Sequence, residues 1–183
     1  MAKSQNNIIT HGLSGKIGNL LVFSQRNGKT VVSAAPRKPA KESENQKEQR
    51  RKFQKAVLYA KAARQQPEYI ETAEQHGKTA YNVAIADFLN APSIESIDLS
   101  GYTGVAGNII RIHATDDFSI KSVSVRITNA DGTLVEEGAA QPSSLSYEWL
   151  YTATAANSNL DGDKIEIFAS DTPGNIAHSE QTM

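Results

Sequence analysis

Apolar and polar residues alternate strictly along the stretch Val123-Ser-Val125-Arg-Ile127. The same alternation runs through Ile110-Arg-Ile112-His-Ala114 and through Ile165-Glu-Ile167-Phe-Ala169. A period of two is typical of a strand that buries one face and exposes the other. Turn-forming residues separate these runs, and about seven short strands of this kind indicate an antiparallel β-sandwich. We predict that residues 93–183 form this sandwich.

The chain before residue 93 has a different pattern. Two β-rich runs flank Asn27-Gly28, a pair that suits a type I′ turn, and they predict a β-hairpin. Helices are predicted over residues 42–66, 67–76 and 79–89, and Pro92 closes the last of them. The apolar stripes expected on the first and third helices comprise Phe53, Ala56, Val57, Ala60 and Ala63, and Tyr81, Ala84, Ile85 and Phe88.

These patterns predict an α+β protein of two domains. Residues 1–92 form a basic hairpin-plus-helices domain, and residues 93–183 form an acidic antiparallel β-sandwich. Residues 1–92 hold fifteen Lys or Arg and seven Asp or Glu, whereas residues 93–183 hold four and thirteen. The net charge of −1 therefore combines +8 with −9. Such asymmetry favours interaction with a polyanion or with other copies of the chain.

Two stretches resemble known families. Residues 94–183 resemble a bacterial immunoglobulin-like domain, through residues 110–117, 123–127 and 131–132, Trp149 and the closing Ala169-Ser-Asp-Thr-Pro-Gly-Asn175. That resemblance implies a sandwich used as a spacer, adhesion unit or assembly module. The N-terminal half is similar to a group of uncharacterised bacterial proteins, through Gly12-Leu-Ser-Gly15-Lys16-Ile-Gly18, Asn27-Gly28-Lys29 and Pro36-Arg-Lys-Pro39. That likeness implies no activity.

Catalytic and cofactor motifs are missing from the sequence. A P-loop needs a glycine five residues before its Gly-Lys pair, and Thr10 and Phe23 occupy those positions. The four histidines lie far apart, and no serine stands in a hydrolase elbow. There is no cysteine for a thiolate site. We therefore predict no enzyme activity, no cofactor and no metal site.

The hydropathy of the sequence allows predictions about membrane insertion and localisation. No run of about 18 apolar residues is present, so no membrane insertion is expected. The polar start of the chain lacks a secretory signal, which predicts a cytoplasmic protein or one exported by another route.

Acidic turns offer one further site. Carboxylates at the predicted turns could bind calcium, but the EF-hand pattern is absent and turn formation alone also explains them, which is the interpretation we favour. These residues are Asp116, Asp117, Asp161, Asp163 and Asp171.

The strongest chemical feature is the basic stretch over residues 37–64. Arg50, Arg51, Lys52 and Lys55 form a candidate basic contact surface. This surface could bind nucleic-acid phosphates or an acidic protein surface. It could also be an ordinary solvated helix with i, i+4 ion pairs.

We predict a non-enzymatic structural protein that self-associates into an oligomer or filament, or joins a larger particle. An isolated hairpin is marginal in water, so the hairpin needs a partner. Its predicted self-assembly contacts are Leu20, Leu21, Phe23, Val31 and Val32. One alternative is a nucleic-acid-binding accessory protein that uses the basic helix. Another is a carbohydrate-binding or adhesion module with Tyr147, Trp149 and Tyr151 exposed, although these aromatics could instead fill the sandwich core.

Overall fold

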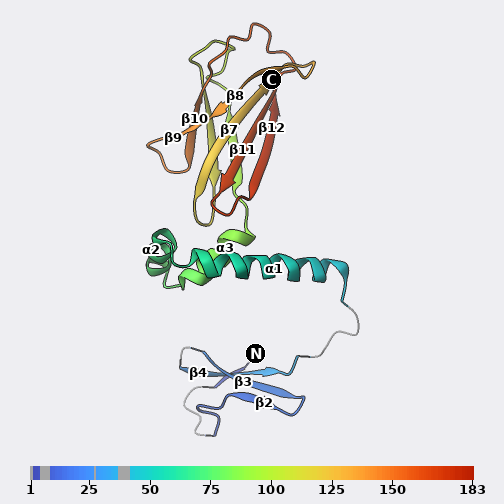
Figure 1. Ribbon diagram of the computed structural model, residues 1–183, viewed down its shortest axis with the longest axis vertical. Helices are drawn as coiled ribbons and strands as arrows, with labels where there is room; N and C mark the ends of the chain where they lie inside the picture. Colours follow the sequence, from blue (N-terminus) through green and yellow to red (C-terminus); the bar gives the residue numbers. More distant parts are fainter. Residues whose placement is uncertain (1, 5–8, 27, 37–41) are drawn as a thin grey trace. The chain divides into compact units, whose positions relative to one another are not determined.

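The computed structural model describes residues 2–4, 9–26, 28–36 and 42–183 (Figure 1). These residues form three helices and three antiparallel sheets of four strands each. The predicted α+β class, with sandwich character, is confirmed at this level. Contacts divide the chain into two compact units, residues 1–47 and residues 48–183. The domain boundary predicted between residues 92 and 93 falls inside the second unit.

The first unit is built on a four-stranded sheet with the order β1-β4-β3-β2. Its strands are β1 (Ala2–Ser4), β2 (Gly15–Ile17), β3 (Leu21–Arg26) and β4 (Lys29–Ala34). The predicted hairpin is confirmed as β3 and β4, which pair from Leu21 with Ala34 to Arg26 with Lys29. At its tip Gly28 has a φ of +72°, which the turn requires. Asn27 lies outside the described residues.

Short flanking strands complete this sheet. β1 pairs with β4, and β2 pairs with β3. Each flanking strand has three residues, too few to show alternation, so the sequence analysis predicted the hairpin alone. Phe23, Val31 and Thr30 are buried.

The helices begin and end close to the predicted positions, at α1 (Glu44–Ala63), α2 (Pro67–His76) and α3 (Ala80–Leu89). Pro67 starts α2, where a missing backbone N–H costs nothing. Gly77 ends α2 in the left-handed conformation at φ 60°. Thr79 caps α3, because its side chain accepts a hydrogen bond of 3.2 Å from the Asn82 backbone N–H.

The helical core differs in part from the expected stripes. Ala60 and Ala63 of α1 pack with Tyr69, Ala73, Val83 and Ala84. Phe53 was expected to be buried, but 49% of its surface is exposed. The α2–α3 pair covers the C-terminal part of α1, and the N-terminal turns of α1 extend past it (Figure 1). In α3, Tyr81, Ile85 and Phe88 are half-buried, while Val83 and Asp87 are buried.

The sandwich consists of two antiparallel sheets, with the orders β5-β6-β10-β9 and β12-β11-β7-β8. Their strands are β5 (Ser93–Asp98), β6 (Ile109–Thr115), β7 (Ile120–Thr128), β8 (Leu134–Ala139), β9 (Gln141–Pro142), β10 (Glu148–Thr152), β11 (Lys164–Asp171) and β12 (Ile176–Thr182). The shared core comprises Tyr102, Ile110, Ile112, Val123, Val125, Ile127, Ala140, Tyr151, Ala153, Ile165, Ile167 and Ala169.

Strand register places the alternating residues as the sequence predicts. Ile165 and Ile167 of β11 stand opposite Ile127 and Val125 of β7, and all four are fully buried. The burial of the aromatic side chains varies along β10. Tyr151 is in the core, whereas Trp149 is only half-buried.

The side-chain amide of Asn175 is one of the contacts that join the helices to the sandwich. Asn175, in the turn between β11 and β12, directs Nδ2 toward the carbonyl oxygens of Asp87, Phe88 and Asn90, at 3.3, 3.3 and 3.1 Å. The same nitrogen donates to Asp171 Oδ2 at 2.6 Å. Asp171 Oδ1 accepts the backbone N–H groups of Gly174 and Asn175. The turn therefore caps the otherwise unpaired C-terminal carbonyls of α3.

We expect Asn175→Ala to lower the free energy of unfolding by about 1–3 kcal/mol, because it removes the side-chain donor to these three carbonyl oxygens and to Asp171 Oδ2. Urea unfolding followed by circular dichroism measures the change. Gln181→Ala, at an exposed position of β12, is the matched control and should stay near the parent value. Equal stability of both variants would contradict the capping role.

Candidate interaction surface

Apolar side chains are exposed on the first unit. Ile17, Leu20 and Leu21 have exposed fractions of 57, 77 and 40%. Ile17 of β2 stands directly opposite Leu21 of β3, so their side chains share a face. Leu20 lies between the two strands, in a turn closed by its N–H to the Ile17 carbonyl at 3.4 Å. We call Ile17, Leu20 and Leu21 the apolar turn.

The structure separates the predicted contact residues into two groups. Leu20 and Leu21 are exposed and belong to the apolar turn. Phe23 and Val31 are buried, at 9 and 5% exposure, and Val32 is half-buried. Buried residues form the core of the unit itself, so of the five predicted contact residues Leu20 and Leu21 are the exposed ones. Ile17 is not among the predicted contact residues, because its strand has three residues and is too short to recognise from the sequence.

The apolar turn lies at an open sheet edge. In the described residues β2 pairs with β3 on one side only, and all three of its residues are exposed. An edge strand presents unpaired N–H and C=O groups that can pair with another strand. An apolar residue at such an edge adds burial to backbone pairing, which is a combination suited to strand addition.

The basic contact surface lies on α1. Arg50, Arg51, Lys52 and Lys55 are all exposed. Lys52 Nζ donates to the Leu89 carbonyl at 2.9 Å, next to the capped end of α3. At 100° per residue the four side chains spread over about 200° of the helix circumference. They do not form one narrow stripe, and nucleic-acid binding by this helix stays a prediction.

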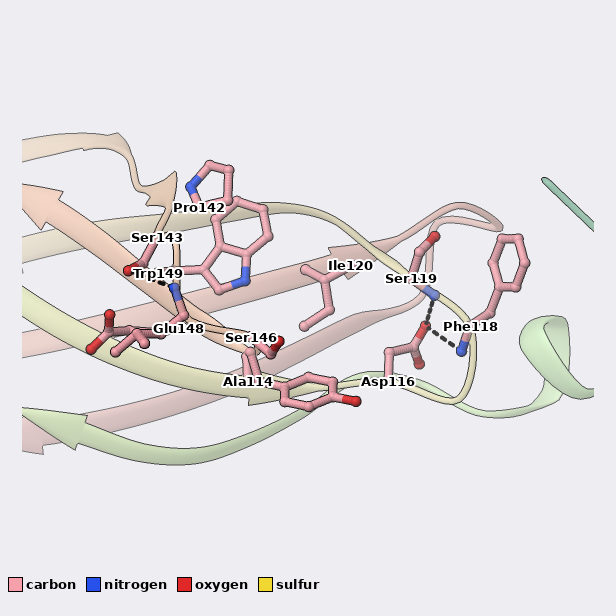
Figure 2. A pocket seen from close by; sticks show the side chains of 12 residues that line it. Ala114, Asp116, Phe118, Ser119, Ile120, Pro142, Ser143, Ser146, Glu148 and Trp149 are labelled. Carbon is pink, nitrogen blue, oxygen red and sulfur yellow. Dashed lines mark hydrogen bonds between the residues drawn. The ribbon is translucent and has the colours of Figure 1, made fainter. Parts of the chain in front are cut away.

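A surface pocket of about 250 Å³ opens on the sandwich. Figure 2 shows Trp149, Glu148 and Pro142 on one side of it, and Asp116 and Phe118 toward the other. Tyr147 also lines the pocket, with 65% of its surface exposed and a φ of +66°. That conformation is strained for an aromatic residue, and strain of this kind often marks a functional position.

The acidic turn residues do not gather at one end of the sandwich. Asp116 and Asp117 follow β6, and Asp171 ends β11, whereas Asp161 and Asp163 precede β11. Asp161 and Asp163 lie before the first residue of β11 and Asp171 is its last residue, so the full length of β11 separates them. Asp171 is occupied by its turn, and Asp163 accepts a hydrogen bond from Asn157 Nδ2 at 2.5 Å. These contacts are those of turn chemistry.

A buried carboxyl lies where the helices meet the sandwich. Asp87 is 1% exposed, and its Oδ2 accepts the hydroxyl of Tyr69. The Tyr59 and Tyr69 hydroxyls are 2.7 Å apart, and the Tyr69 ring stacks on Phe118 at 4.3 Å. Burial, followed by the nearby carboxylates, raises the pKa of Asp87 to about 6, although the Tyr69 hydrogen bond opposes the rise.

Asp87 also borders a polar cavity of about 190 Å³, together with His76, Lys78 and Asp117. Asp87 Oδ1 has no hydrogen-bond partner within the described part of the chain. Sequence analysis did not single out Asp87, because an aspartate at one helical position gives no signal of burial.

Comparisons with known proteins place the chain in no family. No family model and no curated protein matches it. Among solved structures, the crystal structure of CopC from Methylosinus trichosporium OB3b is similar at a TM-score of 0.36 and 16% sequence identity. The match covers 49% of this chain and 87% of that one. A likeness this distant carries no conclusion about fold or function. Among the described helices, none has the length and apolar character needed to cross a bilayer.

We expect Asp87 to make stability depend on pH. Because its pKa is raised in the folded state, the folded chain binds this proton more tightly than the unfolded chain does. The resulting stabilisation is complete below about pH 4 and is lost as the pH rises through about 6. The stability of the parent relative to Asp87→Asn should therefore fall by about 1–3 kcal/mol between pH 4 and pH 7.

Urea unfolding of both proteins across this pH range measures the difference. Tyr69→Phe removes the hydrogen bond that lowers the Asp87 pKa, so in this variant the pH midpoint should move upward. Parallel pH profiles for the parent and Asp87→Asn would contradict the raised pKa.

Proposed function

We propose that this protein is a non-enzymatic assembly subunit that contacts further copies of itself through the apolar turn and the β2 edge. The observation that carries the proposal is the exposure of Ile17, Leu20 and Leu21 beside an edge of β2 that no other described strand pairs with. We also propose that the sandwich is immunoglobulin-like, a scaffold whose usual roles are spacing and assembly.

The free energy of burying the apolar turn supports a contact that is weak when it is made only once. Complete burial of one Leu or Ile side chain is worth about 1.5–3 kcal/mol. The three residues of the apolar turn begin 40–77% exposed, so they can contribute several kcal/mol together. Pairing along β2 adds backbone hydrogen bonds, each worth about 1 kcal/mol net. A single contact is therefore weak, and repetition in an assembly would strengthen it.

Charge supports the sandwich of another copy as the partner surface. The first unit, residues 1–47, has eight basic and two acidic residues, a net of +6. The sandwich, residues 93–183, carries −9. A contact between these unlike surfaces is heterologous, and it propagates as a ring or a filament. Opposite charge speeds and orients the encounter, so the association should weaken with salt.

The acceptor is an edge strand of the β12-β11-β7-β8 sheet. Its two edges, β8 and β12, carry exposed apolar residues of their own. Leu134 of β8 is 59% exposed, and Ile176 of β12 is 66% exposed. Either edge can continue its sheet with the β2 strand of a second copy.

A second candidate function is carbohydrate binding at the pocket of Figure 2. The observation that favours it is the strained, exposed Tyr147 beside half-buried Trp149. Aromatic rings with one accessible face suit the apolar faces of sugars, and carboxylates such as Glu148 accept hydrogen bonds from their hydroxyls.

We expect the full chain at low salt to form a species larger than a monomer, and Leu20→Glu to return it to the monomer, because a charge at this position opposes burial. Light scattering behind size exclusion, over a range of concentrations and salt, measures this. Leu134→Glu and Ile176→Glu test the two acceptor edges.

Val105→Glu is the matched control, because Val105 is 57% exposed, as Ile17 is, and lies in the loop between β5 and β6, outside both edge strands. A parent chain that stays monomeric at every concentration and salt would rule out self-assembly. A large species that persists in Leu20→Glu would place the contact elsewhere.

For the second candidate, we expect neutral oligosaccharides to change the fluorescence of Trp149, the single tryptophan of the chain. Tyr147→Ala should abolish that change and leave the emission of the free protein nearly unaltered. Titration with a panel of neutral mono- and oligosaccharides measures it. Emission that no member of the panel alters would exclude this function.

A further inference from the structure

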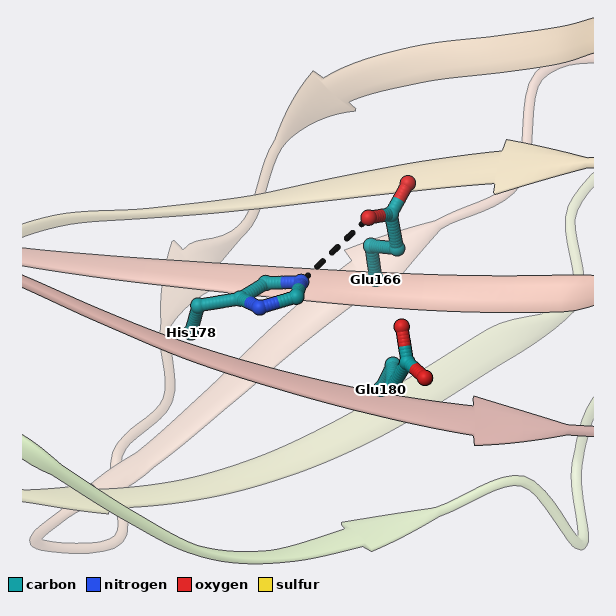
Figure 3. Close-up of side chains that lie close together, drawn as sticks. All are labelled: Glu166, His178 and Glu180. Atoms are coloured by element: carbon teal, nitrogen blue, oxygen red, sulfur yellow. Dashed lines mark ion pairs between the residues drawn. The ribbon is translucent and has the colours of Figure 1, made fainter.

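Two carboxylates and one imidazole converge on the outer face of the sandwich. Glu166 of β11 stands directly opposite Glu180 of β12. His178 precedes Glu180 by two residues and so lies on the same face of the sheet. Neighbouring Ile165 and Ile167 point into the core, which places Glu166 on the outer surface. Figure 3 shows the imidazole and both carboxylates turned toward one another.

The spacing of these groups fits metal coordination. One ligand atom from each residue lies within 4.8 Å of the other two. His178 Nε2 and Glu166 Oε1 are 3.3 Å apart. Bonds of 2.0–2.2 Å in a tetrahedral site separate ligand atoms by about 3.4 Å. Glu180 is the most exposed of the three, at 53% for its side chain, and can close the remaining distance by rotating.

The charge balance of this face favours an added cation. Like charges directly opposite each other on neighbouring strands are destabilising. Lys164 Nζ lies 3.2 Å from Glu180 Oε2 and offsets that carboxylate. Arg126 stands opposite Glu166 on β7, but its Nε donates to Glu137 at 3.0 Å. Glu166 Oε1 instead contacts the His178 imidazole, whose Nε2 lies 3.3 Å away.

Aromatic stacking fixes the imidazole. The ring of Phe168 stacks on His178, with centroids 4.7 Å apart and an interplanar angle of 21°. The guanidinium of Arg126 lies 5.6 Å from the centroid of the Phe168 ring. The imidazole is thereby oriented with Nε2 toward Glu166, before any ligand binds. Preorganised ligands of this kind bind metal more tightly.

We propose that Glu166, His178 and Glu180 form a binding site for a divalent transition-metal ion, with Zn²⁺ the best fit. One imidazole nitrogen and two carboxylate oxygens are a donor set that zinc accepts. The hard ions calcium and magnesium select oxygen donors instead. The side chains of His178 and Glu180 are about half exposed, which leaves room for water as the fourth ligand. The metal would tie edge strand β12 to β11.

Sequence analysis finds no metal site because the ligands come from two strands. His178 lies twelve positions after Glu166, and no local spacing links them. Only the register between β11 and β12 brings them together.

Isothermal titration calorimetry of the full chain with zinc chloride tests the proposal, after chelator treatment and its removal. We expect one zinc ion per chain. His178→Ala and Glu180→Gln should each weaken binding by at least about tenfold, since even loss of a group that only supports a ligand costs 10–100-fold. His76→Ala is the matched control, because His76 is exposed and lies on α2. It should bind zinc as the parent does.

Two further readouts separate metal ligation from a purely structural role. Zinc should shift the ring resonances of His178 in an imidazole-selective NMR spectrum, and it should raise the melting temperature of the parent. Both effects should require at least about tenfold more zinc in Glu180→Gln, an exposed and conservative change. Zinc binding that survives both variants, or that disappears in His76→Ala, would overturn the site.

Discussion

The second unit depends on the contact between Asn175 and the end of α3. Helix C-termini leave carbonyl oxygens unpaired, and burying them without donors is costly. Asn175 reaches the carbonyls of Asp87, Phe88 and Asn90, while Asp171 holds its amide in place. α3 can therefore end against the sandwich and lead almost directly into β5. For the same reason the helices and the sandwich form one compact unit.

That contact also explains why Asp87 and Tyr69 lie together where the helices meet the sandwich. Once α3 ends against the sandwich, Asp87 faces inward and loses most of its water. Tyr69 compensates in part, because its hydroxyl donates to Asp87 and its ring stacks on Phe118 of the β6–β7 loop. A buried, partly satisfied carboxyl is less stabilising than an apolar residue would be. Its hydrogen bonds are directional, however, and they select one orientation of the helices on the sandwich.

Local chemistry predicted the elements well, and long-range pairing explains what it missed. Asn27-Gly28, Pro67, Gly77 and the alternating strands each act within a few residues, so the hairpin, helix ends and core strands could be predicted. Other features depend on residues far apart in the chain. The burial of Phe23, the exposure of Phe53 and the convergence of Glu166 with His178 follow from packing and register. A single sequence holds no direct record of either.

The two units of the structure divide the positive charge of the N-terminal half unequally. Residues 48–92, which include most of α1, α2 and α3, carry only +2, whereas the sandwich that they contact carries −9. The helices therefore neutralise little of the sandwich, and the +6 of the first unit is its main complement. Charges separated by more than about 8 Å are screened at physiological salt. Charge can thus bring two molecules together, but only contacts at short range can hold them. We propose that the apolar turn provides such contacts, because it combines exposed apolar side chains with a strand edge that no other described residue pairs with.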